Sequence, residues 1–283
     1  MLVKEYRTIF FEKLTPLYDV LEVESFFYLI LEEYHQMKRV DLALNPGFVF
    51  SEEVVEKWNL VLQKLSEQIP IQYILGKAHF FGLDFGVNQN TLIPRPETEE
   101  LVDWILKTNQ NDFKELKILD IGTGSGCIAI SLAKNLPNAK VFAMDVSEKA
   151  LATAQKNAKN NNVSVQFLLK NILETDDLLE QFDIIVSNPP YVRNLEKMEI
   201  KPNVLENEPH LALFVEDEDP LIFYRKISEL AEKNLTENGQ LFFEINQYLG
   251  EQMVTLLEQK NFKNIELRKD IYGNDRMVFG RKF

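Results

Sequence analysis

From Glu97 onward the chain alternates between strand-like and helix-like segments, a pattern that few folds accommodate. Short apolar runs are separated by stretches with helical periodicity, such as 147–160 and 221–234. This alternation is typical of an α/β domain built on a parallel sheet. We expect the strands at 117–121, 140–145, 165–169, 182–187, 239–245, 265–270 and 277–280.

The residues before this region have a different hydrophobic pattern. Apolar residues recur at helical spacing in 23–37 and in 51–68, where Ser51 can cap the helix and Glu52 and Glu53 occupy its first turn. From 76 to 95, aromatic and apolar residues are punctuated by Gly82 and Gly86, as in a β-hairpin. We therefore predict a helical domain over 1–75, a hairpin linker over 76–95 and an α/β domain over 96–283.

Composition excludes several classes of protein. The 283 residues include 31 basic and 44 acidic side chains, and the net charge of −13 disfavours a nucleic-acid partner. No apolar stretch approaches the length of a membrane span, and no secretory signal is present, so we expect a cytoplasmic protein. One cysteine and three scattered histidines offer neither a disulfide framework nor metal-ligand spacing.

A predicted strand runs into a glycine loop and then a helix over 118–127, Ile-Leu-Asp-Ile-Gly-Thr-Gly-Ser-Gly-Cys. Such a loop lets a nucleotide-like ligand approach the backbone closely. Asp145, at the end of the next strand, can accept both hydroxyls of an adenosine ribose. An alternative role for it is helix capping. The GxGxG spacing disfavours a dehydrogenase, whose dinucleotide loop has the form GxGxxG.

Another strand ends in Ser187-Asn188-Pro189-Pro190-Tyr191. Two successive prolines hold the backbone extended, so Asn188 should point into the crevice at the carboxyl end of the sheet. The Asn188 side-chain oxygen and the Pro189 carbonyl can both accept hydrogen bonds from one NH2 group, and Tyr191 can offer a flat face. Two acceptors on a conjugated NH2 favour a pyramidal nitrogen whose lone pair can attack. The alternative is a plain turn after a strand.

Together these motifs resemble the S-adenosylmethionine-dependent methyltransferases of amino nitrogens. Within them, the chain is most similar to the HemK/PrmC-type protein-(glutamine-N5) methyltransferases of peptide-chain release factors. The likeness extends to four further segments that lie outside the glycine loop and the Asn-Pro-Pro-Tyr turn. These are 69–76 with 92–99, Glu208-Pro209 before Ala212-Leu213, and 270–276, Asp-Ile-Tyr-Gly-Asn-Asp-Arg.

The resemblance implies a class I, Rossmann-like α/β fold with a seven-stranded, mostly parallel sheet, one antiparallel strand at its edge, and an N-terminal helical bundle that helps dock the substrate. It implies methyl transfer from S-adenosylmethionine, leaving S-adenosylhomocysteine, to the N5 amide of the glutamine in a release factor's Gly-Gly-Gln loop. No metal, nucleic-acid partner or membrane is implied, and we expect a monomer.

The resemblance also assigns residues. The loop residues Gly122, Thr123, Gly124, Ser125 and Gly126 would hold the methionine part of the cofactor, with Asp120 beneath them. Asp145 would take the ribose, and Asn171 and Ile172 would flank the adenine. Asn188, Pro189, Pro190 and Tyr191 would bind the glutamine, with Asn188 also beside the cofactor.

Two positions depart from the family pattern: Asn171 replaces a usual Asp, and Asn246 replaces a usual glycine. Cys127 resembles a nucleophile by position, but methyl transfer needs no covalent step, so we expect a small core residue. Three alternatives stay open. They are a nucleic-acid adenine or guanine N-methyltransferase, which would flip a base into the same turn, a dehydrogenase, and a non-catalytic module that keeps the cofactor fold.

Overall fold

The computed structural model describes residues 1–110 and 115–283, which form two compact units. The helical unit comprises residues 1–76 together with 202–207, and the sheet unit comprises residues 77–201 and 208–283. The hairpin expected as a linker belongs to the sheet unit. The segment 202–207, expected within the α/β domain, groups with the helical unit although 125 residues of the sheet unit, 77–201, precede it in the chain.

The helical unit surrounds an aromatic core. Its helices are α1 (Val3–Leu14), α2 (Val20–His35), α3 (Arg39–Leu44), α4 (Glu52–Ser66), α5 (Ile71–Leu75) and α9 (Pro202–Asn207). The two helices predicted at 23–37 and 51–68 are confirmed as α2 and α4, and Ser51 caps α4 by accepting a hydrogen bond from the Val54 amide. Trp58 of α4 is fully buried and donates to His35 Nε2 over 3.1 Å. Asn207 of α9 donates to the Gln68 carbonyl.

A seven-stranded sheet organises the second unit. Its order is β10-β11-β9-β6-β3-β4-β5. The strands are β3 (Lys117–Ile121), β4 (Lys140–Asp145), β5 (Gln166–Leu169), β6 (Phe182–Ser187), β9 (Leu235–Glu244), β10 (Lys263–Lys269) and β11 (Asp275–Arg281). All seven predicted strands are present, and every pairing from β9 through β5 is parallel.

Two expectations about the sheet need correction. The antiparallel strand, β11, pairs with both β9 and β10, so it lies one place inside the edge and not at it. The tight turn 270–274 folds β11 back beside β10, and the other edge of β11 pairs with β9. In addition, β9 begins at Leu235 and not at Gly239, because the turn-forming residues 236–239 are absorbed in a register irregularity within the strand.

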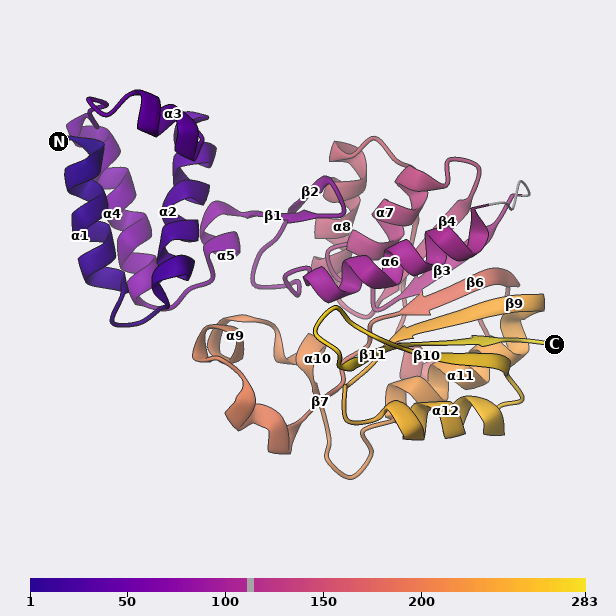
Figure 1. Ribbon diagram of the computed structural model, residues 1–283. Helices are drawn as coiled ribbons and strands as arrows, with labels where there is room; N and C mark the ends of the chain where they lie inside the picture. Colours follow the sequence, from indigo (N-terminus) through magenta and orange to yellow (C-terminus); the bar gives the residue numbers. More distant parts are fainter. Residues whose placement is uncertain (111–114) are drawn as a thin grey trace. The chain divides into compact units, whose positions relative to one another are not determined.

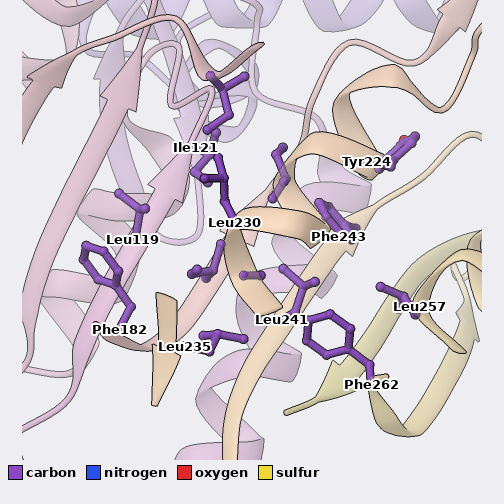
Figure 2. Close-up of a cluster of buried hydrophobic side chains, with 14 of the residues drawn as sticks. Leu119, Ile121, Phe182, Tyr224, Leu230, Leu235, Leu241, Phe243, Leu257 and Phe262 are labelled. Atoms are coloured by element: carbon purple, nitrogen blue, oxygen red, sulfur yellow. The ribbon is translucent and has the colours of Figure 1, made fainter. Parts of the chain in front are cut away.

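Helices cover both faces of the sheet (Figure 1). On one face lie α6 (Pro96–Asn109), α7 (Cys127–Asn135) and α8 (Glu148–Asn160), and on the other lie α11 (Ile222–Asn234) and α12 (Gly250–Gln259). Successive strand residues alternate between the two cores: Leu119 faces α11 and α12, whereas Ile118 faces α6 and α7. Figure 2 shows the first core, where Leu241 and Phe243 of β9 gather with side chains of both helices.

The remaining elements are short. They are β1 (Lys77–Phe80), β2 (Leu83–Gly86), β7 (Val192–Arg193), β8 (Phe214–Val215), α10 (His210–Leu213) and the 3₁₀ turns Ile172–Glu174 and Asn194–Glu199. The pair β1–β2 is the predicted antiparallel hairpin, and β7 pairs with β8 in parallel. Within the described ranges, no helix has the length and apolar character needed to cross a membrane.

Candidate active site

The site lies where the strand order reverses, between β3 and β6. From β3 the chain proceeds to β4 on one side, and it later returns to build β6 on the other. In open α/β sheets the crevice at this point, beyond the carboxyl ends of the strands, is where ligands bind. The ends are held level by the pairing of Ile121 with Ser187, whose hydroxyl donates to the Ile121 carbonyl over 2.7 Å.

The glycine loop leaves β3 over a buried carboxyl group. The Gly122 and Thr123 amides both donate to the Met144 carbonyl, which draws the loop against β4. Thr123 Oγ1 donates to Asp120 Oδ2 over 2.6 Å, while Asp120 Oδ1 is buried and meets no donor in the parts of the chain that the structure describes. Burial raises the pKa of Asp120 to about 7.

Asp145 links the glycine loop to the next helix. Its Oδ2 accepts from the Gly124 amide and its Oδ1 from the Ser147 amide, both over 2.8 Å. Ser147 is itself the cap of α8, so the capping role and a ligand role do not compete for the same residue. Burial raises the pKa of the Asp145 carboxyl, and the backbone hydrogen bonds oppose that rise. Each oxygen keeps a lone pair for a hydroxyl donor.

A cavity of about 340 Å³ opens between these segments. Every lining residue belongs to the sheet unit, and the predicted ligand residues among them are Gly122, Gly124, Asp145, Asn171, Ile172, Asn188, Pro189 and Pro190. The predicted residues that do not line it are Asp120, Thr123, Ser125, Gly126 and Tyr191. The first four are close neighbours of the lining glycines in the chain, and the Tyr191 ring packs against the core of α11 and α12.

The cavity suits a nucleoside joined to an amino acid. Gly122 and Gly124 border it with backbone alone and adopt φ angles of +76° and +56°, so side chains at these positions would be strained and would project beside the loop. The acceptor Asp145 lies among apolar lining groups that include Ile172, Leu173 and Leu92. Asp145 can therefore accept from a pair of ribose hydroxyls, and the apolar groups can pack against a planar base. S-adenosylmethionine fits the residues present.

Asn171 is held by its own turn. Its Oδ1 accepts from the Leu173 amide and its Nδ2 donates to Glu174 Oε1 over 2.9 Å. The first contact is one that an aspartate could also make, whereas the second needs the amide. The substitution therefore keeps the local geometry that places Ile172 at the cavity wall.

The Asn188 turn is tied to two residues that the sequence did not predict. Asn188 Nδ2 donates to Thr98 Oγ1 over 3.3 Å, and Thr98 Oγ1 donates to Glu244 Oε2 over 2.6 Å. The other Glu244 oxygen accepts from the Tyr191 hydroxyl over 3.1 Å. Burial raises the pKa of Glu244, opposed by these hydrogen bonds and by Arg276. Tyr191 thus anchors the turn through its hydroxyl.

The unusual Asn246 supports the same turn from the other side. Its Nδ2 donates to the Tyr191 carbonyl over 3.0 Å and to the buried Glu196 over 2.9 Å. Its Oδ1 accepts from the Tyr248 amide. A glycine could make none of these side-chain contacts. Here the departure from the family pattern adds a brace between the turn and the 3₁₀ turn that follows it.

An ion pair between the buried Glu208 and the partly exposed Arg95 shapes the wall near Leu92. Glu208 accepts from the Ile93 amide over 3.1 Å and from Arg95 Nη2 over 2.6 Å. The next residue, Pro209, lines the cavity. This pair explains why the segments 92–99 and 208–213 carry sequence signals although they lie far apart in the chain.

Cys127 follows the glycine loop as predicted, but burial raises the pKa of its thiol to about 12. A thiolate nucleophile is therefore not formed near neutral pH. Among the described residues, His, Cys, Asp and Glu side chains form no cluster of three or more that could hold a metal ion.

Comparison with known proteins places this architecture in a class and then in a family. Residues 99–212 match the model of the methyltransferase small domain, and residues 22–76 match the PrmC N-terminal domain. The protein is thus a class I, S-adenosylmethionine-dependent methyltransferase with a seven-stranded α/β fold.

Curated relatives span nearly the whole chain. A release factor glutamine methyltransferase of Flavobacterium psychrophilum is 68% identical over 280 residues, which cover 98% of both chains. One of Bacteroides thetaiotaomicron is 44% identical over 94% of this chain and 95% of that protein. The chain belongs to the release factor glutamine methyltransferase family.

Solved structures agree on the fold. The T. thermophilus 16S rRNA methyltransferase RsmC, in complex with AdoMet and guanosine, is 21% identical and aligns with a TM-score of 0.52 over 73% of this chain and 50% of that chain. A methyltransferase from Pyrococcus furiosus is 22% identical, with a TM-score of 0.52 over 71% of this chain and 90% of that chain.

Proposed function

We propose that this protein transfers the methyl group of S-adenosylmethionine to the side-chain amide nitrogen (N5) of the glutamine in the Gly-Gly-Gln loop of peptide-chain release factors, in support of translation termination. The observation that carries the proposal is the Asn188-Pro189-Pro190 turn at the wall of the cavity, next to the glycine loop. The family assignment supports the same substrate.

The residues divide into two groups. Gly122 and Gly124 leave room for the methionine part of the cofactor, Asp145 accepts from the ribose, and Ile172 and Asn171 border the base. When bound, the cofactor supplies a methyl group on a positively charged sulfur. Asn188 Oδ1 and the Pro189 carbonyl accept from the glutamine NH2 and orient its nitrogen toward that methyl group. Catalysis then comes from alignment of the nitrogen with the methyl group. The sulfur leaves as the neutral thioether of S-adenosylhomocysteine, and the methylated nitrogen loses one proton to a neighbouring acceptor or to water.

The proposal also covers substrate docking, oligomeric state and cellular location. The helical unit would help dock the release factor, and the enzyme would act as a monomer, because one sheet unit supplies every residue that lines the cavity. The net charge of −13 supports a protein substrate without direct nucleic-acid binding. A release-factor substrate places the reaction in the cytoplasm, where translation ends.

The test is a labelling experiment. The protein is incubated with S-adenosylmethionine and, in parallel, an unmethylated release factor, its loop Gln→Ala variant, and unmethylated DNA. Mass spectrometry should find one added methyl group on the loop glutamine and none in the variant. Methyl groups in DNA would instead favour a base methyltransferase, and an unmodified release factor alongside measurable cofactor binding would contradict the proposal.

Two substitutions separate catalysis from cofactor binding. Asn188→Ala removes one of the two acceptors for the glutamine NH2, so we expect turnover to fall by about 100-fold or more. Affinity for S-adenosylmethionine, measured by calorimetry, should stay close to that of the wild type. Asp145→Ala should instead weaken cofactor binding. The assignment fails if Asn188→Ala retains normal turnover, or if it loses cofactor affinity as severely as Asp145→Ala.

A further inference from the structure

The Asn188 side chain can face the cavity in two ways, and only one of them suits the reaction. With Oδ1 toward the cavity it accepts from a substrate NH2, whereas with Nδ2 toward the cavity it presents two hydrogens to a group that also carries hydrogens. Rotation by half a turn about the last side-chain bond exchanges the two arrangements without changing the shape of the site. Something in the protein must therefore distinguish oxygen from nitrogen at this position.

Thr98 distinguishes the oxygen of the Asn188 amide from its nitrogen because the Thr98 hydroxyl has only one hydrogen to donate. Its hydroxyl has a single hydrogen, which it donates to Glu244 Oε2 over 2.6 Å. Toward Asn188 the same oxygen can then only accept. The amide group that faces Thr98, at 3.3 Å, is therefore the NH2, and Oδ1 is left for the cavity.

Glu244 in turn keeps the Thr98 hydrogen pointing away from Asn188. Its side chain is fully buried at the end of β9, and each carboxylate oxygen receives one hydroxyl, from Thr98 and from Tyr191. Burial raises the pKa of Glu244, but the two hydroxyl donors and the nearby Arg276 favour its ionised form. In that form the carboxylate has no hydrogen to donate, so neither hydroxyl can reverse. Hydrogen bonds to an ionised acceptor in a buried setting are also the strong ones, which makes this direction well defined.

We propose that Thr98 and Glu244 are positioning residues that fix the orientation of the Asn188 amide, so that its oxygen faces the substrate nitrogen. The inference rests on the proposed function, because it assumes that Asn188 grips an NH2 group. Neither residue lines the cavity, so both act through Asn188 and not by touching the substrate or the cofactor. The hydrogen-bonded series Asn188–Thr98–Glu244 joins the turn after β6 to α6 and β9.

The decisive variants differ by one hydroxyl. Thr98→Val keeps the shape of the side chain but removes the acceptor, and Thr98→Ser restores the hydroxyl. Thr108→Val makes the same change on the same helix, where the hydroxyl donates to the Trp104 carbonyl. Glu244→Gln is a second, independent variant that leaves one acceptor for two hydroxyl donors. For each, kcat and KM with an unmethylated release factor, cofactor affinity and the thermal midpoint are measured.

We expect Thr98→Val to lower kcat by about 100-fold, because a small loss of alignment has that effect. Thr98→Ser should recover kcat to within a few fold of the wild type, Thr108→Val should match the wild type, and Glu244→Gln should be impaired. Cofactor affinity should not change in any of them.

The outcomes distinguish this inference from the proposed function. If the wild type methylates the glutamine but folded Thr98→Val keeps its kcat, or folded Thr98→Ser is as slow as Thr98→Val, the positioning role is wrong and the function stands. If Thr98→Val is too unstable to assay, a fully active Glu244→Gln overturns the positioning role by itself. If the wild type leaves the glutamine unmodified, both proposals fall.

Discussion

At the scale of single residues, Asp120 holds a proton that its unfolded form would release. Burial raises its pKa from 3.8 to about 7, so between these values the folded protein binds more protons than the unfolded chain. The stability that this group contributes is fully present below about pH 4 and is lost as the pH rises through 7. Between low and high pH, this group changes the free energy of unfolding by on the order of 4 kcal/mol at most.

Asp120→Asn should remove this pH dependence. The asparagine oxygen can still accept from Thr123 and from the Ala129 amide, which both bond to Asp120 Oδ2. Urea unfolding of wild type and variant at pH 5 and pH 8 should show the variant gaining stability relative to the wild type at the higher pH. A difference between the two proteins that does not vary with pH would contradict the shifted pKa.

The sequence indicated some of these residues and not others, for a physical reason. Asp145 and Asn188 follow strands directly, so their place at the carboxyl edge of the sheet could be predicted from local pattern. Thr98 and Glu244 act through a hydrogen bond that spans 146 residues of sequence, and no local pattern encodes it. The available signal was an acid at the end of the apolar strand 241–244, where burial demands a partner.

At the scale of elements, one side chain of α8 joins the hairpin to the glycine loop. Asn157 accepts from the Gly86 amide and donates to the carbonyls of Gly86 and Ser125, over 2.7 to 2.9 Å. It is almost fully buried, so no water can replace these partners without opening the structure.

Asn157→Leu should therefore destabilise the protein. It leaves one buried amide and two carbonyls without their partner, and the free energy of unfolding should fall by roughly 2–4 kcal/mol. Denaturant unfolding measures the change. The control is Asn160→Leu on the exposed side of the same helix. Equal losses in both variants would show that the Asn157 contacts are not important for stability.

The elements themselves were more predictable than their arrangement. Strands such as β3 and β6 are mostly apolar, the pattern of strands buried on both faces. The inside position of β11 depends instead on its pairing with β9, from which α12 and β10 separate it in the chain. The early start of β9 was hidden because residues 236–239 look like a turn and lie within a strand irregularity.

At the scale of the whole molecule, each compact unit contains one tryptophan. Trp58 is buried in the helical unit and Trp104 in the sheet unit, which also supplies the whole cavity wall. A ligand that binds the folded sheet unit stabilises it by about 2.7 kcal/mol at 100 times its dissociation constant.

Fluorescence of single-tryptophan variants can locate that effect. In Trp58→Phe the remaining signal comes from Trp104, and S-adenosylmethionine should raise the thermal midpoint. In Trp104→Phe the signal comes from Trp58, and we expect a smaller shift. Identical shifts in both variants would mean that the two units unfold as one cooperative body.

The grouping of α9 with the helical unit also affects the order in which this unit can be completed during synthesis. A ribosome releases residues 1–76 early, but it releases 202–207 only after residues 77–201 have been synthesised. Until then the Gln68 carbonyl lacks the Asn207 amide that it accepts from in the finished protein. The first part of the chain to emerge is therefore among the later parts to be completed, and a nascent chain halted before Pro202 would carry the helical unit without its last helix.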